Sequence, residues 1–268
     1  MQPRKILFVL FTLITLTLHA QRWVGTWACA PQTVDKSFMP YNNQMTNRSV
    51  RQVVKVSIGG NVIRLRLSNE MSSEPVEITS VYIAEAQEGA EIRKGTARYL
   101  QFSKKHGVTI AAGKAVFSDA LKFNLAPLSR ITITINYRKA PKEPTVHMGS
   151  RTTSYILRGI STPNTNFSKA FKEDHWFNIS GIDVYDPTAS SIAILGNSIT
   201  DGKGSTTNAQ NRWPDFMSEI MNANPEKDPT KKDWTGVLNL GIGNNRILSV
   251  GPVSYTHLRA HETDSYLV

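Results

Sequence analysis

The sequence predicts two architectures in one chain: an all-β sandwich or jelly-roll-like domain over residues 21–187, then the start of an α/β domain over residues 188–252. Alternating apolar and polar residues recur through the first region, and a strand–helix–strand pattern follows the pair Asp186 and Pro187. Alternation with a period of two is typical of half-buried strands, whereas a strand–helix–strand unit builds a parallel sheet. The hydrophobic pattern of the sequence therefore changes near residue 187.

The first 20 residues are typical of export. A basic start, MQPRK, precedes the 13-residue apolar run ILFVLFTLITLTL and a small residue at Ala20. Together these features predict a secretory signal peptide over residues 1–20. The apolar run is shorter than the roughly 20 residues that a membrane span needs. We therefore expect an exported protein, periplasmic or extracellular, with no stable membrane anchor.

Composition narrows the classes of partner. The net charge is +10, but the basic residues are scattered through strand-like segments and form no run of five or six. The sequence also lacks zinc-finger spacing and aromatic–basic RNA motifs, so we expect no nucleic-acid partner. Cys29 is the only cysteine, so it forms no internal disulfide. We expect it to be a small buried apolar side chain.

The β-rich region contains several segments in which β-branched residues dominate. Segments with the strand pattern are VRQVVKVSI (50–58), NVIRLRLSN (61–69), VEITSVYIAE (76–85), VTIAAG (108–113), AVFSDALKFNL (115–125) and RITITINYR (130–138). The GGN at 59–61 predicts a hairpin turn between the first two strands. Residues 168–187 are expected to hold a last strand and a connector. Regular strands without a convincing amphipathic helix favour a sandwich or jelly roll.

Beyond residue 187, SSIAIL (190–195) is continuously apolar, which predicts a strand covered on both faces. The segment 211–224 predicts a helix with Pro214 in its first turn. Its expected apolar face is Phe216, Met217, Ile220 and Met221. GVLNLGI (236–242) predicts a second buried strand.

The end of the chain, residues 253–268, departs from this pattern. His257, His261 and Glu262 have a spacing that suggests a metal site. However, VSYTHLRAHET (253–263) resembles the translation of a common sequencing adapter, so we expect residues 253–268 to be a non-native tail. We accordingly expect the native chain to be truncated near Pro252, and we predict no metal site.

The stretch LGNSITDG places Ser198 two residues beyond the end of the first apolar strand. Its spacing fails the phosphate-binding P-loop and the G-x-S-x-G nucleophile elbow, and GIGNNR at 241–246 fails the dinucleotide fingerprint. A serine just past the carboxyl end of a parallel strand lies where open α/β sheets bind ligands. The alternative is a capping or turn serine.

LGNSITDG resembles the first block of the SGNH, or GDSL-type, esterase family, G-D-S-[LIV]-[TS]-x-G, and differs only at Asn197. VLNLGIGNNRIL (237–248) is similar to the second block of that family. RWVGTWACAPQ (22–32) is similar to the opening of members that have a β-rich domain ahead of the hydrolase. The resemblance implies that residues 188–252 begin a flavodoxin-like, parallel three-layer hydrolase domain.

The resemblance also implies roles for particular residues. Ser198 would be the nucleophile and would supply one oxyanion N–H, with a second N–H from Gly243 or Asn244. Asn197 and Asp201 would support the loop. The reaction would be hydrolysis of an ester through an acyl-enzyme, with no metal or organic cofactor.

Neither the third block nor the D-x-x-H block that carries the triad Asp and His is present in the chain. We expect structural or surface roles for His106, His147 and His175. Without its base a serine hydrolase keeps only residual catalysis, so we predict that this chain is essentially inactive. Two strands and one helix would also leave a sheet edge and an apolar face uncovered, and we predict a poorly folded C-terminal part.

For the native protein the resemblance and the export signal imply a secreted serine esterase. Expected substrates are small acetyl or short acyl esters. Acetylated carbohydrates are the preferred class, and lysophospholipids are an alternative. The alternative is a non-catalytic carbohydrate-binding β domain in which Trp23, Trp27 or Trp176 stacks on a sugar ring. Such tryptophans are more often part of a core. The sequence does not determine an oligomeric state.

Overall fold

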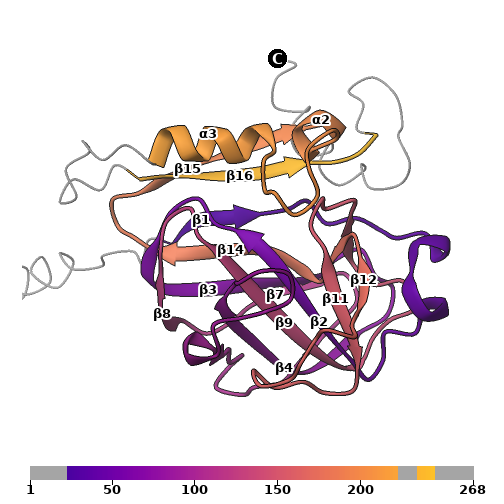
Figure 1. Ribbon diagram of the computed structural model, residues 1–268. Helices are drawn as coiled ribbons and strands as arrows, with labels where there is room; N and C mark the ends of the chain where they lie inside the picture. The colour runs from indigo at the N-terminus through magenta and orange to yellow at the C-terminus, as the bar shows by residue number, and fades with distance from the viewer. Residues whose placement is uncertain (1–22, 223–233, 245–268) are drawn as a thin grey trace, which may run out of the picture.

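The computed structural model describes residues 23–222 and 234–244 (Figure 1). Two antiparallel sheets form a sandwich. The first sheet has the order β1-β14-β3-β7, with β8 also paired to β3, and the second has the order β12-β11-β2-β9-β4-β5, with β6 paired to β4. A small sheet pairs β10 with β13. The strands are β1 (Trp23–Ala28), β2 (Arg48–Lys55), β3 (Gly60–Asn69), β4 (Val76–Glu85), β5 (Arg98–Tyr99), β6 (Val108–Ile110), β7 (Lys114–Phe117), β8 (Leu121–Leu125), β9 (Arg130–Lys139), β10 (Val146–Met148), β11 (Ser154–Arg158), β12 (Phe171–Glu173), β13 (His175–Phe177) and β14 (Ile179–Tyr185). Short 3-10 helices cover Lys36–Phe38, Pro40–Asn43 and Lys94–Thr96.

The core lies between the two large sheets. Val54 and Ile133 from the second sheet are fully buried in the same cluster as Ile63 and Ile182 from the first. Strands β2, β3, β4 and β9 occupy the segments where the sequence alternates, which confirms those strand predictions. Alternate side chains of each strand point into the core between the sheets. In β2 and β9 the intervening polar side chains are buried as well, on the other face of the sheet.

The predicted hairpin at GGN is wrong. Strands β2 and β3 belong to different sheets, so the chain crosses between the layers at this point. A Cβ on Gly59 would lie 2.4 Å from the Leu125 carbonyl oxygen. The glycine is therefore needed for a close backbone approach, not for a tight hairpin turn.

Two other strand assignments also differ from the structure. The segment 108–125, expected to hold two strands, contains β6, β7 and β8. The segment 168–187, expected to hold one, contains β12, β13 and β14, each in a different sheet. Short strands that change sheet interrupt the alternation on which the sequence prediction depends.

The C-terminal unit is built from β15 (Ser190–Gly196), α2 (Ser198–Asp201), α3 (Trp213–Asn222) and β16 (Thr235–Gly241). The two strands pair in parallel and in register, from Ser190 with Thr235 to Gly196 with Gly241. The unit rests on the sandwich next to β1 (Figure 1). The Val237 N–H donates to Ser57 Oγ at 3.0 Å, so the outer edge of β16 is bonded to the sandwich.

This arrangement corrects the predicted fold class. The chain is mostly β, its sheets are antiparallel apart from β15–β16 in the described residues, and it is not an α/β three-layer parallel fold. The local strand–helix–strand pattern does produce a parallel pair. In the described residues, however, β15 and β16 form a separate two-stranded sheet, and the outer edge of β16 bonds to the sandwich.

Burial in the C-terminal unit also differs from the prediction. Strand β15 is largely exposed, so it is not covered on both faces. Helix α3 buries its small and polar residues Pro214, Ser218 and Asn222, whereas Phe216 is 53% exposed and Ile220 is 80% exposed. The expectation of an uncovered apolar face is confirmed. The helix packs against β16 through small side chains, which permit a close approach.

Candidate functional site

The turn that carries Ser198 is closely packed. Asn197 caps α2, and its Oδ1 accepts a hydrogen bond from the Ile199 N–H at 3.0 Å. Ser198 begins the helical turn and is half-buried. A Cβ on Gly196 would lie 2.1 Å from Thr200 Oγ1, so only glycine fits where the strand turns into α2. The sequence G-N-S-I-T therefore specifies this local geometry.

The end of β16 lies beside the same turn. The Ile242 N–H donates to the Gly196 carbonyl at 3.1 Å, and a Cβ on Gly241 would lie 2.3 Å from the Asp201 nitrogen. A Cβ on Gly243 would lie 3.8 Å from Asp201 Oδ2, and Asn244 has a φ of 63°. The parallel register thus brings Ser198, Gly243 and Asn244 to the same end of the β15–β16 pair, where both strands have their carboxyl ends.

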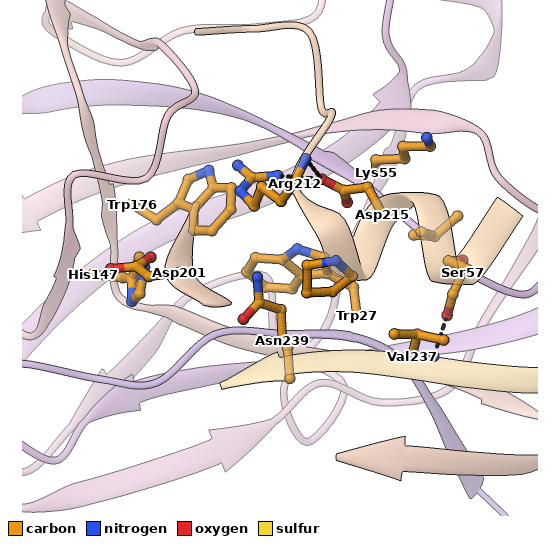
Figure 2. A pocket seen from close by; sticks show the side chains of 14 residues that line it. Trp27, Lys55, Ser57, His147, Trp176, Asp201, Arg212, Asp215, Val237 and Asn239 are labelled. Atoms are coloured by element: carbon orange, nitrogen blue, oxygen red, sulfur yellow. Dashed lines mark hydrogen bonds and ion pairs between the residues drawn. The ribbon is translucent and has the colours of Figure 1, made fainter. Parts of the chain in front are cut away.

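Asp201 is fixed by a histidine from the sandwich. His147 Nε2 lies 2.9 Å from Asp201 Oδ1, and Figure 2 shows these two side chains together. His147 Nδ1 lies 2.9 Å from the Ala30 carbonyl oxygen. The two side chains are 3% and 11% exposed, so water competes little for this contact. The sequence predicted a structural or surface role for His147, and its partner lies 54 positions away, beyond the reach of a local motif.

None of the three described histidines acts on Ser198 in this arrangement. Both ring nitrogens of His147 are occupied, His106 Nδ1 lies 3.3 Å from the Leu100 carbonyl, and His175 Nε2 lies 3.2 Å from the Phe38 carbonyl. His257 and His261 fall outside the described residues. A base for Ser198 is therefore not identified among residues 23–222 and 234–244.

One further ionic contact and a buried arginine join the C-terminal unit to the sandwich. Buried Arg212 pairs with Asp215 at 3.0 Å, donates to the Ser150 carbonyl, and places its guanidinium carbon 5.4 Å from the Trp176 ring centre. Lys55 of β2 is paired with Glu219 of α3. No local sequence signal marks the contacts that cross between the units, because their partners lie far apart along the chain.

The cavity between these groups is small. It measures about 30 Å³ and is lined by residues of both units, including Trp27, Asp201 and Asn239 (Figure 2). Such a volume holds about one water molecule and excludes a substrate. Asn239 Nδ2 donates to the Thr200 carbonyl at 2.8 Å, which further fixes the α2 turn.

The tryptophans suggested for sugar stacking are mainly structural. Trp27 and Trp176 are 7% and 5% exposed, and their rings meet edge to face at 5.0 Å. Trp176 Nε1 donates to the Val53 carbonyl at 3.1 Å. Trp23 is half-buried and packs against Arg64. The faces of Trp27 and Trp176 are therefore not open to a ligand.

Cys29 is buried, as predicted, with an exposed fraction of 2%. Its thiol donates to the Ile179 carbonyl at 3.3 Å, and burial raises the pKa of the thiol well above its usual range, with the Asp201 charge contributing less. The residues described by the structure contain no group of three or more His, Cys, Asp or Glu that could hold a metal ion.

The described helices include none with the length and apolar character that a membrane crossing requires. A comparison with protein-family models finds no family that matches the chain. A search of curated proteins likewise finds no match. The geometry around Ser198, together with the sequence motif, is therefore the basis for a functional proposal.

Proposed function

We propose that the protein is an exported serine esterase whose nucleophile is Ser198. One observation supports this most strongly. Ser198 lies just beyond the carboxyl end of β15. Gly243 and Asn244 lie just beyond the carboxyl end of β16, which is parallel to β15 and in register with it. Acyl transfer requires a nucleophile with backbone N–H donors close by, and these two residues are the proposed donors.

The chemistry follows from these positions. The Ser198 hydroxyl attacks the ester carbonyl carbon while a base takes its proton. The resulting oxyanion accepts hydrogen bonds from the backbone N–H groups of Ser198 and of Gly243 or Asn244. The base gives this proton to the departing alcohol. It then takes a proton from a water molecule that attacks the acyl carbon, and returns it to Ser198 as the acid leaves. Small acetyl or short acyl esters, including those on carbohydrates, are the proposed substrates, and no cofactor takes part.

The base is proposed to lie outside the described residues, in a longer native product of the same gene. The chain as printed should therefore show little activity, because each described histidine is bonded elsewhere. The test compares the printed chain with the product of the uninterrupted gene, using nitrophenyl acetate and acetylated xylan. We expect activity in the longer product only.

Ser198→Ala should abolish that activity, and Ser191→Ala, on the exposed part of β15, is the matched control. Full activity in Ser198→Ala would remove the proposed nucleophile. A longer product that binds acetylated xylan without hydrolysing it would instead favour the carbohydrate-binding alternative.

A further inference from the structure

A second, larger cavity opens at the other side of β16. It has a volume of about 600 Å³ and lies where β1, β3 and β14 of the sandwich meet the end of β16. Pro31, Met71 and Leu240 are half-buried side chains in its wall. Cavities of 300–1,000 Å³ with mainly apolar walls are typical of small-molecule sites.

The polar part of the wall is electrically balanced. Arg66 Nη2 donates to Glu70 Oε1 at 2.9 Å, and Arg66 Nη1 donates to Ser180 Oγ at 2.9 Å. Ser68 Oγ donates to the other Glu70 oxygen at 2.7 Å. Arg66 and Glu70 are the charged residues in the described wall, so their charges cancel. A charged ligand would lose its hydration without gaining an uncompensated opposite charge.

The composition of the apolar wall limits the class of ligand further. The described lining contains no aromatic ring, so it offers no stacking platform for a sugar or a heterocycle. Cys29, which also lines the cavity, bonds through its thiol to the backbone and presents a neutral sulphur. Aliphatic carbon is the complement of such a surface.

We propose that this cavity binds a small, uncharged aliphatic molecule. Its chain contacts Pro31, Met71 and Leu240, and its polar end meets Arg66 and Ser180. Leu240 belongs to β16 whereas the other residues belong to the sandwich, so the ligand also links the two units. This inference does not depend on Ser198 chemistry and goes beyond the proposed esterase activity.

The test is calorimetric titration of the full chain with 1-octanol, octanoate and octylammonium, which differ in the charge of one end. We expect saturable 1:1 binding of 1-octanol and at least tenfold weaker binding of both ions. Met71→Lys places a charge in the wall and should weaken octanol binding at least tenfold. Ile220→Lys, at an exposed apolar position on α3, should leave it unchanged.

A charge-selectivity variant sharpens the result. Glu70→Gln leaves the Arg66 charge without its carboxylate partner, so octanoate binding should improve at least tenfold relative to 1-octanol. Near-ultraviolet circular dichroism checks the fold of each variant. The proposal fails if 1-octanol shows no saturable binding, if the ions bind as well as the alcohol, or if Ile220→Lys weakens binding as much as Met71→Lys does.

Discussion

His147 and Asp201 join the sandwich to the turn that carries Ser198. The imidazole bridges a backbone carbonyl at Ala30 and the Asp201 carboxylate, with both contacts at 2.9 Å. Carbonyl and carboxylate oxygens are both hydrogen-bond acceptors, so the imidazole joins one acceptor of the sandwich to one of the C-terminal unit. The position of the Ser198 turn is thus set partly by a residue about 50 positions earlier.

The first prediction concerns this contact. His147→Ala should lower the free energy of unfolding by about 2–4 kcal/mol, because it leaves a largely buried carboxylate without its partner. Amide hydrogen exchange should accelerate over residues 196–204, which surround α2. His106→Ala is the control, because His106 lies in an exposed turn. Equal exchange in the two variants would show that His147 does not hold this turn.

The second prediction concerns the approach of β16 to β1. A Cβ on Gly236 would lie 2.0 Å from the Gly25 carbonyl oxygen, so Gly236→Ala must push the strands apart. Limited proteolysis should then cut within residues 186–190 several times faster, while the sandwich remains intact. Gly95→Ala is the control, since a Cβ there meets nothing within 4 Å. Unchanged cleavage in Gly236→Ala would contradict the close packing of the two units.

The third prediction concerns alkaline pH. Burial raises the folded-state pKa of the Cys29 thiol above its usual 9.0 and that of the Tyr137 hydroxyl above its usual 10.0. Above those usual values the unfolded chain releases protons that the folded chain retains. The stability from each group is therefore complete below its usual pKa and decreases as pH rises, by about 1.4 kcal/mol per pH unit.

Urea denaturation from pH 8 to 11 measures this effect. Cys29→Ala should reduce the loss of stability between pH 9 and 10, because the variant has no thiol to ionise. Tyr137→Phe should change the slope only above pH 10, which makes it the internal comparison. A Cys29→Ala slope identical to that of the parent protein would indicate that the thiol ionises equally in both states.

The fourth prediction compares two buried polar residues of α3. Ser218 Oγ has no hydrogen-bond partner within the described part of the chain, whereas Asn222 bonds the backbone of Thr235 in both directions, at 2.9 and 3.2 Å. Ser218→Ala should be neutral or stabilise by up to about 1 kcal/mol, and Asn222→Ala should destabilise by about 1–3 kcal/mol. Thermal unfolding checks both values. A larger loss for Ser218→Ala would reveal a bonded hydroxyl.

Much of the local structure was predictable from the sequence. Alternation identified the long strands β2, β3, β4 and β9, and Pro214 marked the first turn of α3. Cys29, the single cysteine of the sequence, was correctly expected to be buried. The glycine and capping residues around Ser198 specify a strand-to-helix turn because their backbone and side-chain constraints act within a few residues.

Only the tertiary structure decided which surfaces meet. At Gly59 the chain crosses between the sheets instead of forming the expected hairpin. The small residues of α3 are the buried ones, and His147 is bonded to Asp201. It also excluded the three-layer parallel fold. A periodic pattern shows that a strand or helix has an apolar face, but the surface that covers it is set by contacts between residues far apart in the chain, which local periodicity does not encode.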